Sequence, residues 1–138
     1  MPDEQHDHNA AGRGYLPGLL GVNFTSAGEG WVEADLTIRP ELMAPNGFLH
    51  AGTIITLADT CCGYGCGRAL PEGASGFTTV ELNANFLGTA REGVIAARAE
   101  ALHLGRSTQL WDARVTNKAT GKTLALFRCT QMVLWPKG

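Results

Sequence analysis

One acidic residue, Asp59, lies in the middle of an apolar stretch and is the first candidate for chemistry in this sequence. The stretch runs from Asn46 to Arg68, NGFLHAGTIITLADTCCGYGCGR, and begins in a Pro-Asn-Gly turn. Its apolar residues cover most of the circumference of a helix, so we expect a helix that is buried on all sides. A carboxylate is costly to bury unless it is paired with a cation or used in a reaction. Because no basic residue follows Asp59 on this helix until Arg68, we favour a functional carboxylate over a structurally paired one.

The composition limits the classes of function that are open to this chain. Its 138 residues suffice for one domain with a proper core. The 11 basic residues are outnumbered by 13 acidic ones and are not clustered, which argues against nucleic-acid binding. Charged or polar residues interrupt every apolar run before it reaches the length of a membrane-spanning helix, and the acidic N-terminus is unlike a signal peptide. We therefore expect a cytoplasmic protein with no nucleic-acid and no membrane partner.

Two groups of potential metal ligands are better explained without a metal. The four cysteines contain no Cys-x-x-Cys pair, so we expect buried, reduced thiols that fill core space, with a metal site as the alternative. His6 and His8 fall within residues 1–14, which we predict to be a flexible arm without function. We therefore expect no metal. The cysteines are Cys61, Cys62, Cys66 and Cys129.

Alternation of apolar and polar residues indicates β-strands on both sides of the helix. A short helical turn at 15–20 and a strand at 22–27 come first, and residues 31–38 alternate cleanly. Four more strands with short connections follow the helix, which indicates antiparallel neighbours. The first of these strands should turn one apolar face toward the core. That face consists of Thr78, Val80, Leu82, Ala84 and Phe86.

These elements form a single domain over residues 15–138. We expect an α+β fold in which a curved antiparallel sheet wraps one long buried helix. One sheet cannot enclose a helix that is apolar all round. We therefore expect part of the helix, or an edge of the sheet, to meet a second subunit.

The start of the helix resembles a known family. Pro45 to Gly52, followed by Leu57-Ala58-Asp59, is similar to the hotdog-fold acyl-CoA thioesterases of the PaaI-like, phenylacetate-pathway group. The signature of that group is His-Gly-Gly with an acidic residue nine positions after the histidine, a spacing that His50 and Asp59 keep. The likeness covers residues 41–134. It implies a hotdog fold, hydrolysis of a coenzyme A thioester with an aromatic or medium-chain acyl group, and no cofactor, since coenzyme A is part of the substrate.

Two positions depart from the pattern of this family. Ala51 stands where the family usually has the first glycine, which is a mild change because a backbone N–H does the work there. Ala44, six residues before His50, stands where the family commonly has an Asn or Gln that holds the thioester carbonyl. A side-chain donor is therefore missing, and the sequence does not indicate what replaces it.

Thioester hydrolysis needs a carboxylate that attacks or activates water, and donors for the developing oxyanion. Asp59 is the expected base or nucleophile. The N–H groups of Ala51 and Gly52, at the positive end of the helix, are the expected donors. A rise of ~1.5 Å per residue separates them from Asp59 by roughly 12–14 Å. They can meet only across two subunits, so we expect a homodimer or a dimer-of-dimers tetramer with sites at the subunit interface.

Two further side chains are expected to assist this reaction. Thr79 matches a position where the family often has a Ser or Thr that orients the water, and its alternative role is that of an ordinary strand residue. His50 either orients the thioester or fixes the turn into the helix by a hydrogen bond to the backbone.

Substrate-binding residues are expected in the turn before the helix and near strand ends. Cations at these places suit the phosphates of coenzyme A, although each is otherwise a solvated surface charge. The predicted substrate-binding residues are Asn46, Gly47, Arg91, Arg106 and Lys122.

Two other functions stay open at this point. One is a non-catalytic acyl-CoA-binding hotdog protein, in which the missing donor at Ala44 reflects lost activity. The other is a hotdog dehydratase or hydratase, which uses a histidine and an acidic residue for proton transfer at carbon but spaces the two differently. The identity of the acyl group and the choice of nucleophile or general base for Asp59 do not follow from the sequence.

Overall fold

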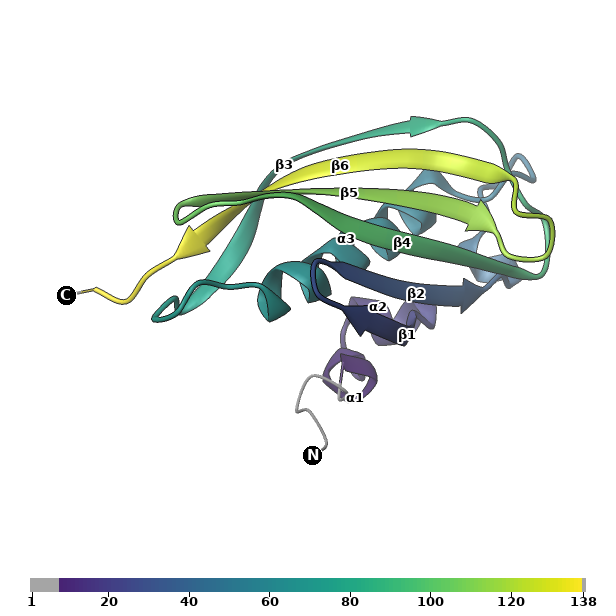
Figure 1. Cartoon of the computed structure of the whole chain (residues 1–138). Helices are drawn as coiled ribbons and strands as arrows, with labels where there is room; N and C mark the ends of the chain where they lie inside the picture. Colours follow the sequence, from purple (N-terminus) through teal and green to yellow (C-terminus); the bar gives the residue numbers. More distant parts are fainter. Residues whose placement is uncertain (1–7, 138) are drawn as a thin grey trace.

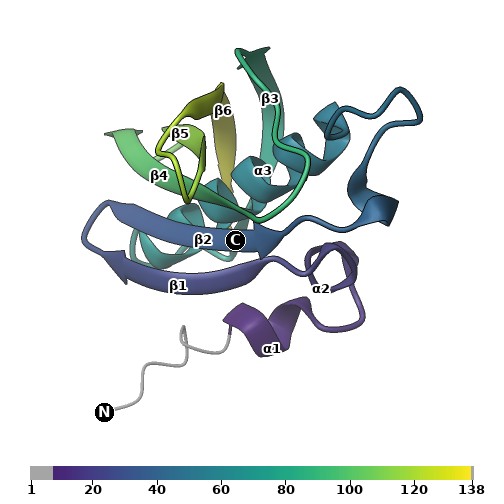
Figure 2. The same cartoon turned by 90° about the vertical axis from the view of Figure 1, so that its right-hand side faces the viewer.

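The computed structural model describes residues 8–137. Within these residues a six-stranded sheet curves around one long helix, α3, and two short helices lie beside strand β1 (Figure 1, Figure 2). The elements in chain order are α1 (His8–Gly12), α2 (Leu16–Leu20), β1 (Asn23–Gly28), β2 (Trp31–Thr37), the 3-10 helix η2 (Pro40–Leu42), α3 (Ala51–Arg68), β3 (Gly76–Phe86), β4 (Val94–Leu104), β5 (Thr108–Asn117) and β6 (Thr123–Leu134).

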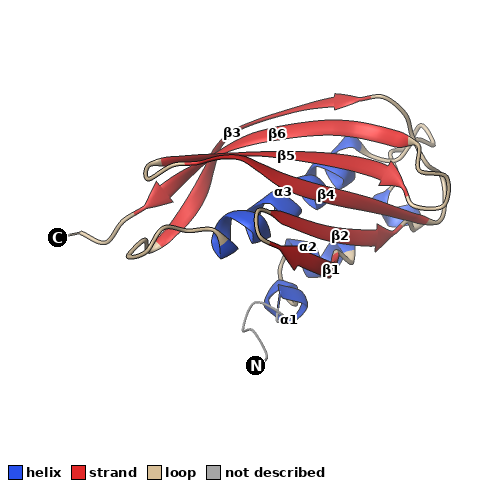
Figure 3. Ribbon diagram, viewed as in Figure 1, coloured by secondary structure: helices blue, strands red, loops and turns tan. Residues whose placement is uncertain are grey.

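The strand order of the sheet is β1-β2-β4-β5-β6-β3, and every neighbouring pair is antiparallel. Strand β3 directly follows helix α3 in the chain, but it pairs with the last strand, β6, and so becomes an edge of the sheet (Figure 3). One face of the sheet packs on α3. This architecture confirms the predicted α+β hotdog fold.

The core lies between helix α3 and the inward face of the sheet. In β2, Val32, Ala34 and Leu36 are buried, as the alternation predicts. All four cysteines are buried free thiols, which confirms their expected packing role. Burial raises the pKa of Cys61 and of Cys66 to about 12, so these two thiols stay neutral.

Two features are absent from the part of the chain that the structure describes. No group of three or more His, Cys, Asp or Glu side chains comes together in residues 8–137 in a way that could hold a metal ion. None of the helices in this range is long and apolar enough to cross a membrane.

Helix α3 is not buried over its whole surface. One stripe of the helix, at intervals of three or four residues, stays half-buried or exposed, although Phe77 of β3 approaches it near Gly63 and Gly67. Within a single chain the helix is therefore not buried on all sides, and Asp59 lies in the middle of this stripe. The uncovered stripe consists of Gly52, Ile55, Thr56, Asp59, Thr60, Gly63 and Gly67.

A β-bulge in β3 changes which residues of this strand face the helix. Thr79 pairs with Gln131 of β6 and Glu81 pairs with the next residue, Thr130, so Val80 is an extra residue without a partner. Before the bulge Phe77 and Thr79 face α3, and after it the even-numbered residues do. The predicted apolar face is thus correct for Leu82, Ala84 and Phe86, which pair with buried residues of β6. It is wrong for Thr78, which pairs with the exposed Met132, while Val80 is the bulged residue and is itself exposed.

The described part of the predicted arm is folded against the domain. In helix α1, the side chain of Asn9 accepts a hydrogen bond from the N–H of Phe24 at 2.7 Å and donates one to its C=O at 3.3 Å. The ring of His8 stacks on Tyr64 of α3 with 4.2 Å between the ring centroids. These contacts give residues 8–12 a fixed position on β1, whereas residues 1–7 of the predicted arm lie outside the described residues.

Helix α3 approaches the sheet closely at Gly65. A Cβ atom at this position would lie 2.5 Å from atoms of the Trp111 indole. That indole is held in place, because its Nε1–H donates to Gln109 at 2.8 Å and Gln109 in turn donates to the C=O of Ala69 at 3.0 Å. The indole has no room to move aside, so only glycine fits at position 65.

Gly65→Ala is expected to lower the free energy of unfolding by about 1–3 kcal/mol, because overpacking against the fixed indole outweighs the better helix propensity of alanine. Gly67→Ala is the matched control, since its Cβ would meet Phe77 at an ordinary 3.7 Å. Denaturant unfolding of the two variants measures the difference. Equal stabilities would contradict the close approach at Gly65.

Candidate active site

Asp59 lies on the uncovered stripe of α3, where it is half-buried. Burial raises the pKa of its carboxyl group, and a hydrogen bond from Thr79 opposes this effect when the Thr79 hydroxyl donates to Asp59. The distance from Thr79 Oγ1 to Asp59 Oδ1 is 3.4 Å. A carboxylate with a raised pKa is a stronger base than an ordinary surface carboxylate, so Asp59 is suited to take a proton from water.

Thr79 connects Asp59 to a buried amide. Its hydroxyl donates a hydrogen bond of 2.8 Å to Oε1 of Gln131, a residue with no exposed surface. The sequence pattern indicates Thr79 near the acid, whereas Gln131 was not predicted. The alternation of β6 could have indicated it, because Gln131 stands between Cys129 and Val133 at a position that faces the core.

His50 forms the N-terminal cap of helix α3. Its Nδ1 accepts a hydrogen bond of 2.8 Å from the N–H of Gly52, and its C=O accepts from the N–H of Thr53 at 3.0 Å. This geometry supports the structural alternative for His50. It also differs from the predicted pair of free donors, because the N–H of Gly52 is engaged within the chain. The first N–H of the helix, that of Ala51, has no acceptor in the helix and stays available to a ligand.

The loop before α3 brings together three of the predicted substrate-binding residues. Asn46 Oδ1 accepts from the N–H of Phe48 at 3.2 Å, and Gly47 adopts a φ of +89°, which favours glycine. Arg91 Nη1 donates to the C=O of Gly47 at 2.7 Å, and its guanidinium lies 5.4 Å from the centre of the Phe48 ring. One cation is thus fixed next to the start of the helix.

The other two predicted cations lie at different places. Lys122, in the turn between β5 and β6, lies beside Gly88, because a Cβ on Gly88 would be 3.5 Å from Lys122 Nζ. Gly88 belongs to the same β3–β4 loop as Arg91. Arg106 lies in the β4–β5 turn, with its guanidinium 4.1 Å from the Trp135 ring. The full length of β4 separates this turn from the loop of Arg91, so a single chain does not bring Arg106 to the start of the helix.

Helix α3 is continuous from Ala51 to Arg68. Eight residues separate Ala51 from Asp59, a distance of about 12 Å along the axis. The free N–H at the start of the helix and the carboxylate in its middle therefore cannot contact the same atom of a substrate within one chain.

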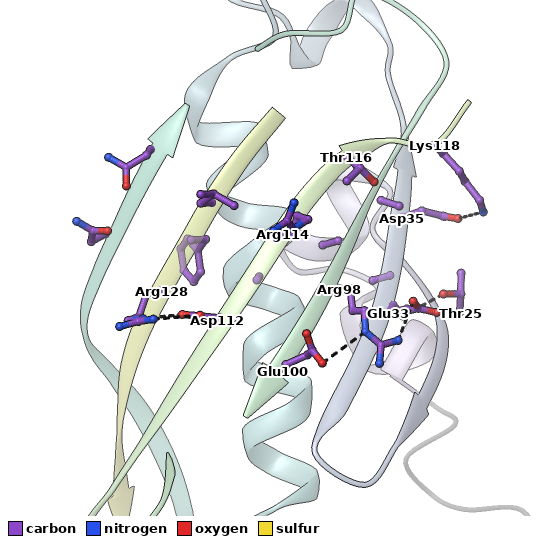
Figure 4. Close-up of a pocket in the computed structure, with 18 residues that line it drawn as sticks. Thr25, Glu33, Asp35, Arg98, Glu100, Asp112, Arg114, Thr116, Lys118 and Arg128 are labelled. Atoms are coloured by element: carbon purple, nitrogen blue, oxygen red, sulfur yellow. Dashed lines mark hydrogen bonds and ion pairs between the residues drawn. The ribbon is translucent and has the colours of Figure 1, made fainter. Parts of the chain in front are cut away.

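A large groove of about 790 Å³ lies on the opposite face of the sheet from α3, away from Asp59. Figure 4 shows that most of its charged side chains pair with each other, whereas Arg114 donates to the hydroxyl of Thr123 at 3.1 Å. The pairs are Arg98 with Glu33 at 3.0 Å, Arg128 with Asp112 at 2.6 Å and Lys118 with Asp35 at 2.8 Å. Charges that neutralise one another on a solvated face do not form a catalytic centre, so the candidate site is the uncovered stripe of α3.

Comparison with known proteins places the chain in a family. Residues 46–124 match the family model of the thioesterase superfamily. A 1,4-dihydroxy-2-naphthoyl-CoA hydrolase from Listeria monocytogenes is 32% identical over 115 residues, which cover 83% of this chain and 92% of the relative. The Escherichia coli protein of the same name is 31% identical over 126 residues and covers 91% of each chain.

Solved structures of related proteins share the fold over almost the whole chain. Thioesterase PA1618 from Pseudomonas aeruginosa, crystallised as a mutant, is 28% identical with a TM-score of 0.89, and the match covers 97% of this chain and 96% of that one. The PaaI protein from the phenylacetic acid degradation operon of Escherichia coli is 25% identical with a TM-score of 0.82, covering 94% and 91%. The resemblance to PaaI-like thioesterases is thereby confirmed.

The cap formed by His50 is testable by two substitutions. His50→Ala removes the acceptor for the N–H of Gly52 and is expected to lower the free energy of unfolding by about 1 kcal/mol. His50→Asn is expected to restore most of this loss, because Asn is a favoured N-cap residue. Thermal unfolding of the wild type and both variants measures the effect. An Asn variant as unstable as the Ala variant would show that His50 stabilises the protein in another way.

Proposed function

Because this chain belongs to the thioesterase superfamily, we propose that it hydrolyses an acyl-CoA thioester to a free acid and coenzyme A, with Asp59 as the base or nucleophile. Asp59 is the acidic residue of α3, and it lies half-buried on the uncovered stripe beside Thr79. Burial raises its pKa. This single carboxylate, open to a substrate but partly shielded from water, is the observation on which the proposed activity depends.

We infer that the active site forms between two copies of the chain. Two features support a partner on the same side of the molecule: the uncovered stripe of α3 and the unpaired edge of β3. Beside that edge, Val80, Leu82 and Phe86 are 51%, 40% and 44% exposed. An apolar surface next to a free strand edge favours pairing with a second subunit. The partner would bring the start of its own α3 to Asp59, either in a homodimer or in a dimer of dimers.

The proposed reaction begins with water. Asp59 takes a proton from a water molecule while the water oxygen attacks the carbonyl carbon of the thioester. The carbonyl oxygen becomes an oxyanion and accepts a hydrogen bond from the N–H of Ala51 of the other subunit. The C–S bond then breaks, its electron pair leaves with the sulfur, and the proton from Asp59 passes to that sulfur, which gives the acid and the free thiol. If Asp59 attacks instead, it forms an anhydride that water hydrolyses to the same products.

His50 supplies a second donor at the start of the helix in this proposal. Its Nδ1 accepts from Gly52, so the neutral imidazole carries its proton on Nε2. The side chain is exposed. We assign this Nε2–H to the thioester carbonyl, where it takes the place of the side-chain donor that is missing at Ala44.

Coenzyme A is proposed to lie along the loop before α3. Arg91 is fixed there by its hydrogen bond to Gly47. Lys122, from the β5–β6 turn, lies next to Gly88 of the loop that contains Arg91. Both are suited to bind phosphate groups. Arg106, at the far end of β4, would serve only a substrate that extends onto another subunit.

An aromatic or medium-chain acyl group fits the surroundings of Asp59 best. Gly63 lies one helical turn after Asp59 on the uncovered stripe, and a Cβ on it would be 3.5 Å from Cζ of Phe77. The Phe77 ring therefore lies over this part of the helix, where an aromatic or alkyl group next to the carboxylate would pack on it. The names of two relatives state naphthoyl-CoA, an aromatic thioester, as their substrate.

A non-catalytic acyl-CoA-binding protein is the second candidate, because Ala44 offers no side-chain donor and its N–H already donates to the C=O of Phe48 at 2.7 Å. Such a protein would gain thermal stability from coenzyme A esters but would release no thiol. This result in a panel of aryl-CoA and alkyl-CoA esters would replace the proposed activity.

Asp59→Asn is expected to lower kcat for thiol release by about 10²–10⁴-fold, because an amide cannot accept a proton from water at neutral pH. Asp112→Asn is the control, since that carboxylate pairs with Arg128 on the far face of the sheet. Release of free thiol from a panel of acyl-CoA esters measures both variants. Full activity of Asp59→Asn would refute the role of this carboxylate.

Ala51→Pro removes one N–H at the first helical position, where proline is favoured, and His50 already has the extended ψ of 134° that a residue before proline adopts. The variant is expected to fold and to lose about 10²–10³-fold in kcat. Ala51→Ser keeps the N–H and is the control.

Mixed dimers of Ala51→Pro and Asp59→Asn chains test whether the site is shared. Each mixed dimer contains one intact site if Ala51 and Asp59 act across the interface, so about half of the wild-type activity should return. Co-expression with two different affinity tags gives the mixed species. If the mixed dimers were as inactive as the two parent proteins, Ala51 and Asp59 of the same chain would have to act together in one site.

A further inference from the structure

A row of polar side chains crosses the inward face of the sheet next to Asp59. Thr79 of β3 pairs with Gln131 of β6, and Gln131 pairs with Gln109 of β5, so the three side chains lie side by side on neighbouring strands. Both glutamines are fully buried, with 0% exposure. A buried amide without hydrogen bonds costs stability. The two glutamines therefore need partners, and those partners differ.

Gln109 has a structural role that its contacts explain. Its Nε2 donates to the C=O of Ala69 at 3.0 Å and its Oε1 accepts from the indole of Trp111 at 2.8 Å. Gln131 is different, because its Oε1 accepts from the Thr79 hydroxyl and its Nε2 has a long contact of 3.5 Å with the sulfur of Cys129. The strong hydrogen bond of Gln131 thus points to the candidate site.

The Thr79 hydroxyl has one proton and two acceptors nearby. Gln131 Oε1 lies at 2.8 Å and Asp59 Oδ1 at 3.4 Å. A distance of 2.8 Å is typical of O–H···O hydrogen bonds, whereas 3.4 Å is long. The proton therefore goes to Gln131, and the lone pairs of Thr79 Oγ1 stay available on the side of Asp59.

We propose that Gln131 is a positioning residue that makes Thr79 a hydrogen-bond acceptor, not a donor, at the active site. The inference rests on the proposed function. A water molecule beside Asp59 then donates one proton to the carboxylate and the other to Thr79 Oγ1, and its free lone pair points toward the thioester carbon. Gln131 contacts neither water nor substrate and acts only through Thr79.

Loss of Gln131 changes the site in a defined direction. Without this acceptor, the Thr79 hydroxyl turns its proton to Asp59. A hydrogen bond to the charged carboxylate lowers its pKa and its basicity. The water molecule also loses Thr79 Oγ1 as an acceptor for its proton, because the Thr79 hydroxyl has become a donor. Catalysis should therefore slow, while the binding of the substrate should change little.

The test compares Gln131→Met, which keeps the length of the side chain but lacks the amide, with the wild type. We expect kcat to fall about ten-fold, as for the loss of one hydrogen bond of about 1.4 kcal/mol, with KM nearly unchanged. We also expect the acidic limb of the pH profile to move to lower pH. An unchanged or raised acidic limb would overturn the proposal, since Thr79 would then already donate to Asp59 in the wild type.

Cys62 is another titratable group whose pKa Asp59 affects. Contact with Cys129 and burial raise the pKa of the Cys62 thiol well above its ordinary value. This thiol stays neutral over the acidic range. A shift of the acidic limb therefore reports on Asp59.

Two further variants separate positioning from stability. Gln109→Met removes the neighbouring buried amide and is expected to lower the melting temperature without moving the acidic limb. In the Thr79→Val background, Gln131→Met should have no additional effect on kcat, because the hydroxyl that it orients is gone. An equal loss of kcat from Gln131→Met in both backgrounds would overturn the proposal.

A measurement without turnover keeps this inference distinct from the proposed function. In protein labelled with carbon-13 at the aspartate carboxyl groups, the Asp59 signal is identified by its absence from Asp59→Asn. Its titration midpoint should move to lower pH in Gln131→Met but not in Gln109→Met. Identical midpoints in the wild type and Gln131→Met would refute the inference, whether or not any ester is hydrolysed.

Discussion

Helix α3 packs on the sheet along one side only, and this contact sets the distances in the candidate site. Close approach requires Gly65, which lets the helix backbone meet the indole of Trp111. Leu57 and Ala58 face the sheet and are fully buried, whereas Asp59 lies at the border of the packed surface. The carboxylate is therefore shielded enough for its pKa to rise and open enough to meet a substrate. If the helix lay farther from the sheet, the pKa of Asp59 would not be raised. If the helix were enclosed completely, no substrate could reach Asp59.

The position of Thr79 depends on one extra residue in β3. Regular alternation that begins at Thr78 places Thr79 on the outer face of the sheet, away from Asp59, and the resemblance to the thioesterases conflicts with that alternation. The bulge at Val80 resolves the conflict, because odd-numbered residues face the helix before the bulge and even-numbered residues face it after the bulge. The extra residue leaves no mark in the apolar pattern, since Val80 and Leu82 are both apolar. Bulges of this kind are frequent next to active sites, where they re-aim a side chain.

The sequence predicts well those features that depend on local pattern and poorly those that depend on distant contacts. The alternation of β2 was sufficient because both neighbouring strands bury the same face. His50 and Asp59 were found by their spacing, but the engagement of the Gly52 N–H by His50 required the geometry of the cap. The sequence predicts that one sheet cannot enclose the whole helix, but not which residues form the uncovered stripe, because apolar and small residues such as Ile55 and Gly63 do not reveal which side lacks a neighbour. The packing of α1 also depends on Phe24, a residue fifteen positions away from Asn9.

The two edges of the sheet differ in a way that limits assembly. At β1 the side chain of Asn9 occupies both outward backbone groups of Phe24, and a register shift between Phe24 and Ser26 breaks the regular spacing of the strand. At the other edge, β3 presents eleven residues. A sheet with one obstructed edge and one accessible edge can join a single further copy, edge to edge, with two-fold symmetry. An edge-to-edge dimer of this kind would leave no accessible edge for a third copy, so growth would end after one addition and would not continue into fibres.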